Sequence, residues 1–300
     1  MCEINSPDNT IFHYCSVDSF FNIIKSKSFR LGDIEKSNDS LEKKLVINAI
    51  IKLLSEELEK TTDQIIRNAI RETQKIVQVH DLHSYVCCFS EERDFLSQWR
   101  GYADEAYGMA IGVDKSKVDI EIPRYNFFKV SYDSKEMEDD CRRIINEAMA
   151  DTMPIFHLGS AENLFINLQE RLWSIYLKYK NSAFKYENEW RIVANGGFMY
   201  QIYDNRRLVI SIESPEMPEG NIENIRFSKL QHCVINKQVR SYIDLIFEDV
   251  RNSFIKEIWL GPKCKNTEED VHILLSESGY DVETMYSNRF RVHTSSASYR

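Results

Sequence analysis

Short segments with the composition of β-strands alternate with helical segments of unequal length along this 300-residue chain. Residues 11–15 and 29–31 are rich in aromatic and branched side chains, and a helical pattern that begins after Ser16 separates them. Further strand-type segments follow at residues 85–90 and 109–113. Strands and helices that alternate irregularly, without a sequence repeat, predict an α+β fold around a mixed central sheet.

Residues 40–79 form the longest helical stretch within this alternation. Asp39 lies three residues before Glu42, which is the spacing of a helix capping box. Apolar side chains then recur at helical intervals in two blocks on either side of residues 61–63: Ile47, Ile50, Ile51, Leu54 and Leu58, then Ile66, Ile70 and Val77. We predict a helical hairpin over residues 40–79, inserted into a single domain spanning residues 1–300, as a lid or a surface for a partner protein.

The second half of the chain carries the remaining predicted elements. Helical patterns cover residues 134–151 and 162–180, and strand patterns lie near residues 126–132, 189–194 and 207–212. A turn at residues 214–219 precedes a final unit of strand 255–260, helix 268–278, Gly279 and strand. The predicted helix 162–180 leads directly into an acidic segment.

Composition narrows the class of protein. The net charge of −9 disfavours broad nucleic-acid binding, which needs clustered Lys and Arg. No apolar run reaches the roughly 18 residues of a membrane span, and the first residues lack the features of a signal peptide. The seven cysteines are irregularly spaced, so we expect reduced thiols. These features favour a cytoplasmic protein with no membrane partner.

The acidic segment Tyr186-Glu187-Asn188-Glu189-Trp190-Arg191 carries the densest set of ionisable side chains. In an extended strand Glu187, Glu189 and Arg191 project from one face, while Trp190 projects into the core on the other. Arg191 can hold one glutamate and leave the second for a ligand or a proton. The alternative is an ordinary ion pair on an exposed strand face.

His13 and an aromatic cluster are further candidates. His13 lies in an apolar strand just before a helix N-cap, where its imidazole could reach a ligand, or it could be a hydrogen-bonded core histidine. Trp99, Arg100 and Tyr102 could stack on a planar ring or bind an anion, although Trp99 could equally serve helix packing.

Several common sites have no sequence support. His80 and His83 precede Cys87 and Cys88, but adjacent cysteines in a strand point to opposite faces, so we expect no zinc site. No phosphate-binding glycine loop, no nucleophile elbow and no H-E-x-x-H motif occurs. A reaction led by carboxylates remains after these exclusions, with no metal.

A set of short strings resembles the bacterial family of proteins numbered as domain of unknown function 2971. The strings are His13-Tyr14-Cys15-Ser16, Asn38-Asp39 with Glu42, Cys88-Phe89-Ser90, Trp99 with Tyr102-Ala103, Tyr186-Glu187-Asn188-Glu189-Trp190-Arg191, Leu260-Gly261-Pro262, and Ser287 with Arg289. The resemblance spans nearly the whole chain. The helical insert at residues 40–79 and Cys15, where a threonine is usual, depart from the family pattern.

The opening strand, helix and strand are distantly similar to those of histidine-type ADP-ribosyltransferases. That similarity implies an ADP-ribosyltransferase-like fold and NAD as a substrate. It implies that His13, with Tyr14 beside it, contacts the NAD ribose, and that Glu189 or Glu187 directs the transfer. Trp99, Arg100, Tyr102 and Arg191 are the further expected contacts to NAD, and Tyr102 or Tyr107 is the positional candidate for the aromatic that stacks on nicotinamide.

The predicted function is therefore an NAD-using ADP-ribosyltransferase-like effector, in a bacterial toxin or anti-phage role, with a protein or nucleic-acid acceptor. A non-catalytic module that senses a nucleotide or binds a protein is the alternative, and a metal-dependent nuclease is a third hypothesis. If Glu187 pairs with Arg191, Glu189 is the free carboxylate, and the converse assignment stays open.

Overall fold

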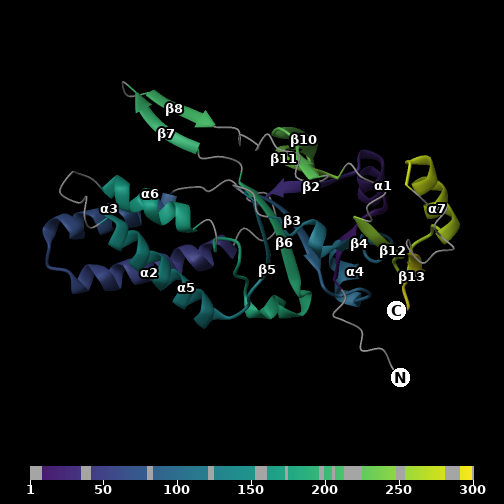
Figure 1. Cartoon of the computed structure of the whole chain (residues 1–300), viewed down its shortest axis with the longest axis horizontal. Coiled ribbons are helices and arrows are strands. Elements are labelled where there is room, and N and C mark those ends of the chain that lie inside the picture. Colours follow the sequence, from purple (N-terminus) through teal and green to yellow (C-terminus); the bar gives the residue numbers. More distant parts are fainter. Residues whose placement is uncertain are drawn as a thin grey trace.

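We describe the chain from a computed structural model, which describes residues 9–34, 42–79, 84–120, 125–152, 161–172, 175–195, 199–204, 207–212, 225–247, 254–280 and 291–298. A cluster of helices lies at one end of the molecule, and the strands of the central sheet occupy the middle and the other end (Figure 1). The sheet contains both antiparallel and parallel pairs, which confirms the α+β class with a mixed central sheet.

The main path through the sheet runs in the order β10-β11-β2-β3-β1-β4-β12-β13. Its strands are β1 (Thr10–Cys15), β2 (Ser28–Asp33), β3 (Ser84–Ser90), β4 (Met109–Asp114), β10 (Gln231–Ile235), β11 (Gln238–Phe247), β12 (Ile255–Leu260) and β13 (Arg291–Thr294). Off this path, β6 (Glu189–Asn195) lies between β3 and β5 (Tyr125–Lys129), and β9 (Ile225–Phe227) pairs with β11. A separate hairpin consists of β7 (Met199–Asp204) and β8 (Arg207–Ile212).

The first helix shows how local sequence sets the frame of the sheet. Ser16 caps α1 (Val17–Ser26) by accepting a hydrogen bond from the Ser19 backbone nitrogen, and Phe20 and Ile24 are buried on its inner face. Lys27 adopts a left-handed conformation that ends the helix and turns the chain into β2. On the same side, α7 (Glu268–Glu277) contributes Val271 and Leu275 to the same core.

Strand β3 has three neighbours, and this creates a fork in the sheet. One edge of β3 pairs with β6 over its whole length, from Ser84–Asn195 to Ser90–Glu189. The other edge pairs with β2 near Tyr85 and with β1 only at Ser90. Between these two contacts β1 and β2 diverge, so the sheet opens beside the middle of β3.

The helices at residues 42–79 are part of a larger helical cluster. Helix α2 (Glu42–Lys60) and helix α3 (Gln64–Val79) pack against α5 (Ser134–Thr152) and α6 (Ala161–Leu172), which come much later in the chain. Their shared core includes Ile50, Leu54, Ile70, Ile145 and Leu168, all buried. The hairpin therefore does not stand alone, because two later helices complete its core.

One sequence prediction differs from the structure here, and one hairpin was not predicted. The helix predicted to reach residue 180 ends at Leu172. Residues 178–180 lie beside Ser131, with the Ser131 backbone nitrogen donating to the Lys178 carbonyl and the Lys180 backbone nitrogen donating to the Ser131 carbonyl. The apolar spacing of Ile175 and Tyr179 fits this segment as well as a helix, because both side chains are buried in the core of the helical cluster. The hairpin β10–β11 was not predicted, and the predicted turn at residues 214–219 lies outside the described residues.

Candidate functional site

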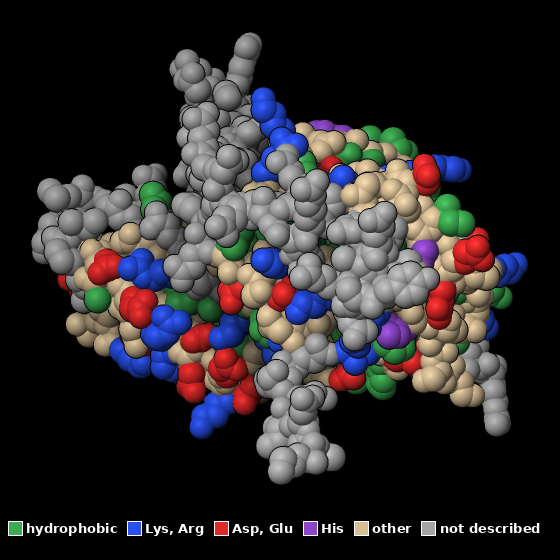
Figure 2. Space-filling view, turned by 45° about the vertical axis from the view of Figure 1, so that its right-hand side comes forward, with side chains coloured by type: hydrophobic (Ala, Val, Ile, Leu, Met, Phe, Trp, Pro, Cys, Tyr) green, Lys and Arg blue, Asp and Glu red, His purple; other side chains and the backbone are tan. Residues whose placement is uncertain are grey.

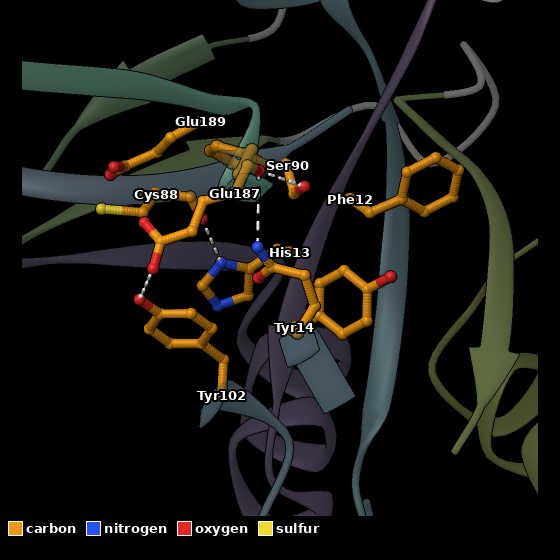
Figure 3. Close-up of a pocket in the computed structure, with 10 residues that line it drawn as sticks. Phe12, His13, Tyr14, Cys88, Ser90, Tyr102, Glu187 and Glu189 are labelled. Carbon is orange, nitrogen blue, oxygen red and sulfur yellow. Dashed lines mark hydrogen bonds between the residues drawn. The ribbon is translucent and has the colours of Figure 1, made fainter. Parts of the chain in front are cut away.

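A pocket opens at the fork of the sheet, where β1 and β3 meet the segment before β6 (Figure 3). It contains about 460 Å³ of empty space, part of which is open to solvent. Its lining combines aromatic, hydroxyl, amide, thiol and carboxylate groups: Phe12, His13, Tyr14, Cys88, Phe89, Ser90, Gln98, Tyr102, Glu187 and Glu189. The structure thus brings His13 and both glutamates of the acidic segment to one cavity.

Glu187 reaches the pocket from a 3-10 helix and not from a strand. The helix η4 covers Ser182–Glu187, Asn188 then adopts a left-handed conformation with φ 43°, and β6 begins at Glu189. The prediction that Glu187, Glu189 and Arg191 share one face of a strand is therefore wrong for Glu187, because the left-handed residue breaks the alternation. The Glu187 carbonyl accepts a hydrogen bond from the Ser90 hydroxyl at 2.6 Å, which fixes this turn against β3.

The carboxylate of Glu187 has a partner on each oxygen. The Tyr102 hydroxyl donates to Oε1 at 2.8 Å, and the Lys180 ammonium donates to Oε2 at 2.7 Å. Burial and the contact with Glu187 raise the pKa of Tyr102, so its hydroxyl keeps its proton and acts as a donor. Figure 3 shows Tyr102 extending from the opposite side of the pocket to meet Glu187.

Glu189 is held by two cations. Arg191 donates to both of its carboxylate oxygens, from Nε at 2.7 Å and from Nη2 at 3.0 Å, and Lys180 donates to Oε2 at 3.1 Å. Arg191 is completely buried, and its Nη1 donates to the Leu177 carbonyl. Lys180, Glu187, Glu189 and Arg191 therefore form a buried ionic cluster with two positive and two negative charges.

Lys180 is the functional neighbour that the sequence did not indicate. It is buried, and it reaches both glutamates because residues 178–180 are not helical and pair with Ser131, just beyond the end of β5. A single lysine in an apparently helical segment carries no local signal of burial. Only this pairing, which depends on tertiary structure, places it beside Glu187 and Glu189.

The ionic cluster determines the protonation of Glu189. Burial would raise the pKa of this carboxyl, but the charges and hydrogen bonds of Arg191, followed by Lys180 and the Cys88 thiol, outweigh burial and lower the pKa to about 2. The Cys88 pKa moves in the opposite direction, raised first by burial and then by the negative charge of Glu189. Glu189 is therefore an anion at neutral pH, and Cys88 is a protonated thiol.

We expect this pKa to make the protein sensitive to acid. A carboxyl with a pKa lowered from 4.5 to about 2 by folding contributes stability that is complete above pH 4.5 and lost as the pH falls toward 2. The contribution corresponds to roughly 3 kcal/mol. Urea unfolding at pH 6 and pH 3 should show that the stability gap between the wild type and Glu189→Gln narrows in acid. A gap that does not change with pH would contradict the assignment.

His13 closes the fork of the sheet. Its Nδ1 lies 2.9 Å from the Cys88 carbonyl, and since a carbonyl can only accept, Nδ1 carries the hydrogen and donates. Burial lowers the pKa of His13, against the effect of this hydrogen bond, so the ring is neutral. Among the described residues no hydrogen bond to Nε2 is found, and in this tautomer Nε2 is an acceptor.

The other predicted contacts divide into two groups. Tyr14 and Tyr102 line the pocket, and the Tyr102 side chain is half exposed at its rim. Trp99 does not line the pocket, because it is buried against Tyr14 with ring centroids 4.8 Å apart and donates to Asp94. Arg100 is exposed outside the lining, and Arg191 lies behind Glu189. The lining residues Cys88, Ser90 and Gln98 were not predicted as contacts.

None of the residues that line the pocket comes from α2 or α3, so the helical hairpin does not form a wall of the pocket. Within the part of the chain that the structure describes, no group of three His, Cys, Asp or Glu side chains is arranged to hold a metal ion, and His80 and His83 lie outside that part. No described helix is long and apolar enough to cross a membrane.

Chemically, the pocket offers carboxylate oxygens on one wall and a hydrogen-bond acceptor on the facing side. The carboxylate oxygens of Glu187 lie at the wall and receive hydrogen bonds from Tyr102 and Lys180. The Nε2 atom of His13 can accept a hydrogen bond from a ligand hydroxyl. The aromatic rings of Phe12, Tyr14 and Tyr102 provide apolar surface. These groups suit a neutral or positively charged ligand that has hydroxyl groups and a flat ring.

A comparison with family models finds a match for part of the chain. The model of a family described as proteins of unknown function, DUF2971, matches residues 98–192. This stretch runs from α4 (Leu96–Tyr102) into β6, so it includes the ionic cluster and Tyr102 but not His13. No curated protein and no solved structure matches the chain. The match supports the resemblance over residues 98–192, and these comparisons lend no support to the similarity with ADP-ribosyltransferases.

Proposed function

We propose that the pocket binds the nicotinamide–ribose end of NAD and that the chain transfers ADP-ribose from it to an acceptor. The observation that supports this proposal is the pairing of His13 and Glu187 in one cavity, with a buried ionic cluster behind Glu187. A nicotinamide ring and one ribose supply the flat ring, the positive charge and the hydroxyl groups that the lining suits.

Glu187 is the carboxylate to which we assign the chemical role. Glu189 is committed to Arg191 through both oxygens, whereas Glu187 receives one of its hydrogen bonds from Tyr102, a side chain at the open rim. A ribose hydroxyl could take the place of the Tyr102 hydroxyl without removing the ion pair with Lys180. Glu189 then acts as a positioning residue, because it holds Lys180 and Arg191 in place.

The proposed reaction needs NAD as the donor of ADP-ribose, an acceptor molecule and the Glu187 carboxylate. The bond between the ribose C1′ and the nicotinamide nitrogen breaks, and its electron pair leaves with nicotinamide. Positive charge develops on the ribose, and the nearby carboxylate stabilises it. The acceptor forms a new bond to C1′ and loses a proton, and when water is the acceptor the products are nicotinamide and ADP-ribose.

A second function has one observation in its favour. All four carboxylate oxygens of Glu187 and Glu189 already have hydrogen-bond donors, which is typical of a site that binds without reacting. In that case the pocket senses a nucleotide, and its occupation is passed to a partner protein. Binding of NAD without turnover would distinguish this function from the transferase.

To test the proposal, the purified chain is incubated with NAD labelled in the adenosine part, alone and with bacterial protein and RNA as acceptors. We expect free nicotinamide at a rate above the spontaneous one, with label either on an acceptor or in ADP-ribose. Thermal stabilisation by NAD without nicotinamide release would select the sensing function. Neither stabilisation nor release, from a chain shown to be folded by circular dichroism, would exclude both.

A further inference from the structure

The hairpin β10–β11 exposes apolar side chains at the far edge of the sheet. Val234 is 70% exposed and Val239 is 67% exposed, and the two face each other across the hairpin. Ile235, next to the turn, is 40% exposed. Figure 2 shows hydrophobic side chains at the surface of the upper part of the molecule, at the height where Figure 1 places this hairpin. Exposed apolar side chains on an edge strand and on the strand next to it are unusual for a solvated surface.

The register of the hairpin determines which backbone groups face outward. Asn236 and Lys237 form a two-residue turn with φ values of 51° and 64°, which is the type I′ geometry, so Ile235 and Gln238 form a hydrogen-bonded pair. Alternation then directs the backbone N–H and C=O groups of His232 and Val234 away from β11. Among the strands that the structure describes, β10 pairs only with β11, so within the described residues these groups form an edge without a strand partner.

This edge lacks the features that normally prevent strand pairing. Residues 231–235 are Gln, His, Cys, Val and Ile, with no Lys, Arg, Asp, Glu or Pro among them. The register with β11 is continuous, with no bulge. Edge strands that stay unpaired usually carry a charge, a proline or a bulge. The sequence and geometry of β10 instead favour the addition of another strand.

We propose that a second copy of this chain pairs with β10 along this edge, in antiparallel orientation and with the twofold axis at Val234. In this register Val234 faces Val234 of the second copy, and Cys233 faces Ile235 of the second copy, so every central pair is apolar. The pairing stops at Ile235, because Asn236 and Lys237 form the turn. A twofold axis at Cys233 would instead place His232 against Val234, which is less favourable.

A second copy fits this edge because the twofold axis pairs apolar residues of β10 with apolar residues of the same strand in the second copy. Its location also leaves the pocket accessible, since β11 and β2 separate β10 from β3. The paired segment is short, so we expect weak association that is visible at protein concentrations of about 100 µM. The proposal does not depend on NAD or on the function of the pocket.

Cysteine crosslinking tests the register. In the proposed dimer residues 233 and 235 of the two copies form a non-hydrogen-bonded pair, with Cα atoms about 4.5 Å apart, which is within the range for a disulfide. Oxidised Ile235→Cys should therefore run as a dimer on a non-reducing gel, linked between residues 233 and 235 as identified by peptide mass spectrometry. Adding Cys233→Ser should abolish the link. Val239→Cys is the matched control, because residue 239 is more exposed than residue 235 but lies on the inner strand, and it should give no such link.

Sedimentation tests the association itself. Val234→Lys places like charges on the twofold axis and should raise the dimer dissociation constant at least about tenfold. Val239→Lys adds the same charge to the same hairpin and should leave the constant within about twofold of the wild-type value. A monomeric wild type at about 100 µM with no crosslink from Ile235→Cys overturns the proposal, as does equal crosslinking of Ile235→Cys and Val239→Cys.

Discussion

Replacing Arg191 by methionine is expected to lower the free energy of unfolding by about 3–5 kcal/mol. Arg191 is completely buried and supplies two of the hydrogen bonds that hold the Glu189 carboxylate. Its loss leaves two buried carboxylates with Lys180 as the remaining cation of the cluster, and it leaves the Leu177 carbonyl without this donor. The measurement is urea unfolding followed by circular dichroism at neutral pH.

The double variant Arg191→Met with Glu189→Gln separates charge from packing. It restores one negative and one positive charge in the cluster, so it should be less destabilised than the sum of the two single variants. Arg143→Met is the matched control, because Arg143 pairs with Asp140 and Glu147 on the exposed face of α5 and should change stability by less than about 1 kcal/mol. A loss for Arg191→Met as small as that of Arg143→Met would contradict a buried cluster.

Replacing Glu187 by glutamine is expected to reduce nicotinamide release by about a hundredfold or more. Glutamine has the shape of glutamate and can still accept a hydrogen bond from Tyr102, but it carries no charge to stabilise the ribose in the transition state. Lys180 keeps Glu189 as its partner, so the variant should remain folded. The measurement is the initial rate of nicotinamide formation at saturating NAD, together with the melting temperature.

The control for this prediction is Glu138→Gln. Glu138 also forms ion pairs, with Lys52 and Arg142, but it lies on the helical cluster and does not line the pocket. Its rate should equal that of the wild type. If Glu187→Gln retains the wild-type rate while Glu189→Gln loses it, the roles of the two glutamates are reversed from our assignment.

Hydrophobic periodicity was sufficient to predict most of the elements around the pocket. The strand at residues 11–15, the cap at Ser16 and the two helices within residues 40–79 depend on local patterns, and the structure contains each of them. Prediction failed where a pattern fitted two conformations. Ile175 and Tyr179 continue the helical spacing of α6, yet they lie in a later segment that is not helical and pairs with Ser131.

The site was predictable in its residues but not in its pairing. The acidic segment identified Glu187, Glu189 and Arg191, and the structure brings the two glutamates and His13 to one pocket. The left-handed Asn188 and the arrival of Lys180 decide which glutamate pairs with which cation. Both depend on contacts between distant parts of the chain, such as the hydrogen bond from Ser90 to the Glu187 carbonyl. Trp99, for which packing was an equal alternative, is buried against Tyr14 and does not line the pocket.

The most direct test of the proposed site is the ¹⁵N resonance of His13 Nε2 during a titration with NAD. The ring is neutral and Nδ1 is committed to the Cys88 carbonyl, so a ribose hydroxyl in the pocket should donate to Nε2. We predict an upfield shift of this one signal, assigned by its absence in His13→Gln, with the other histidine signals unchanged. A His13 signal that stays constant while NAD binds or turns over would contradict the placement of NAD between His13 and Glu187.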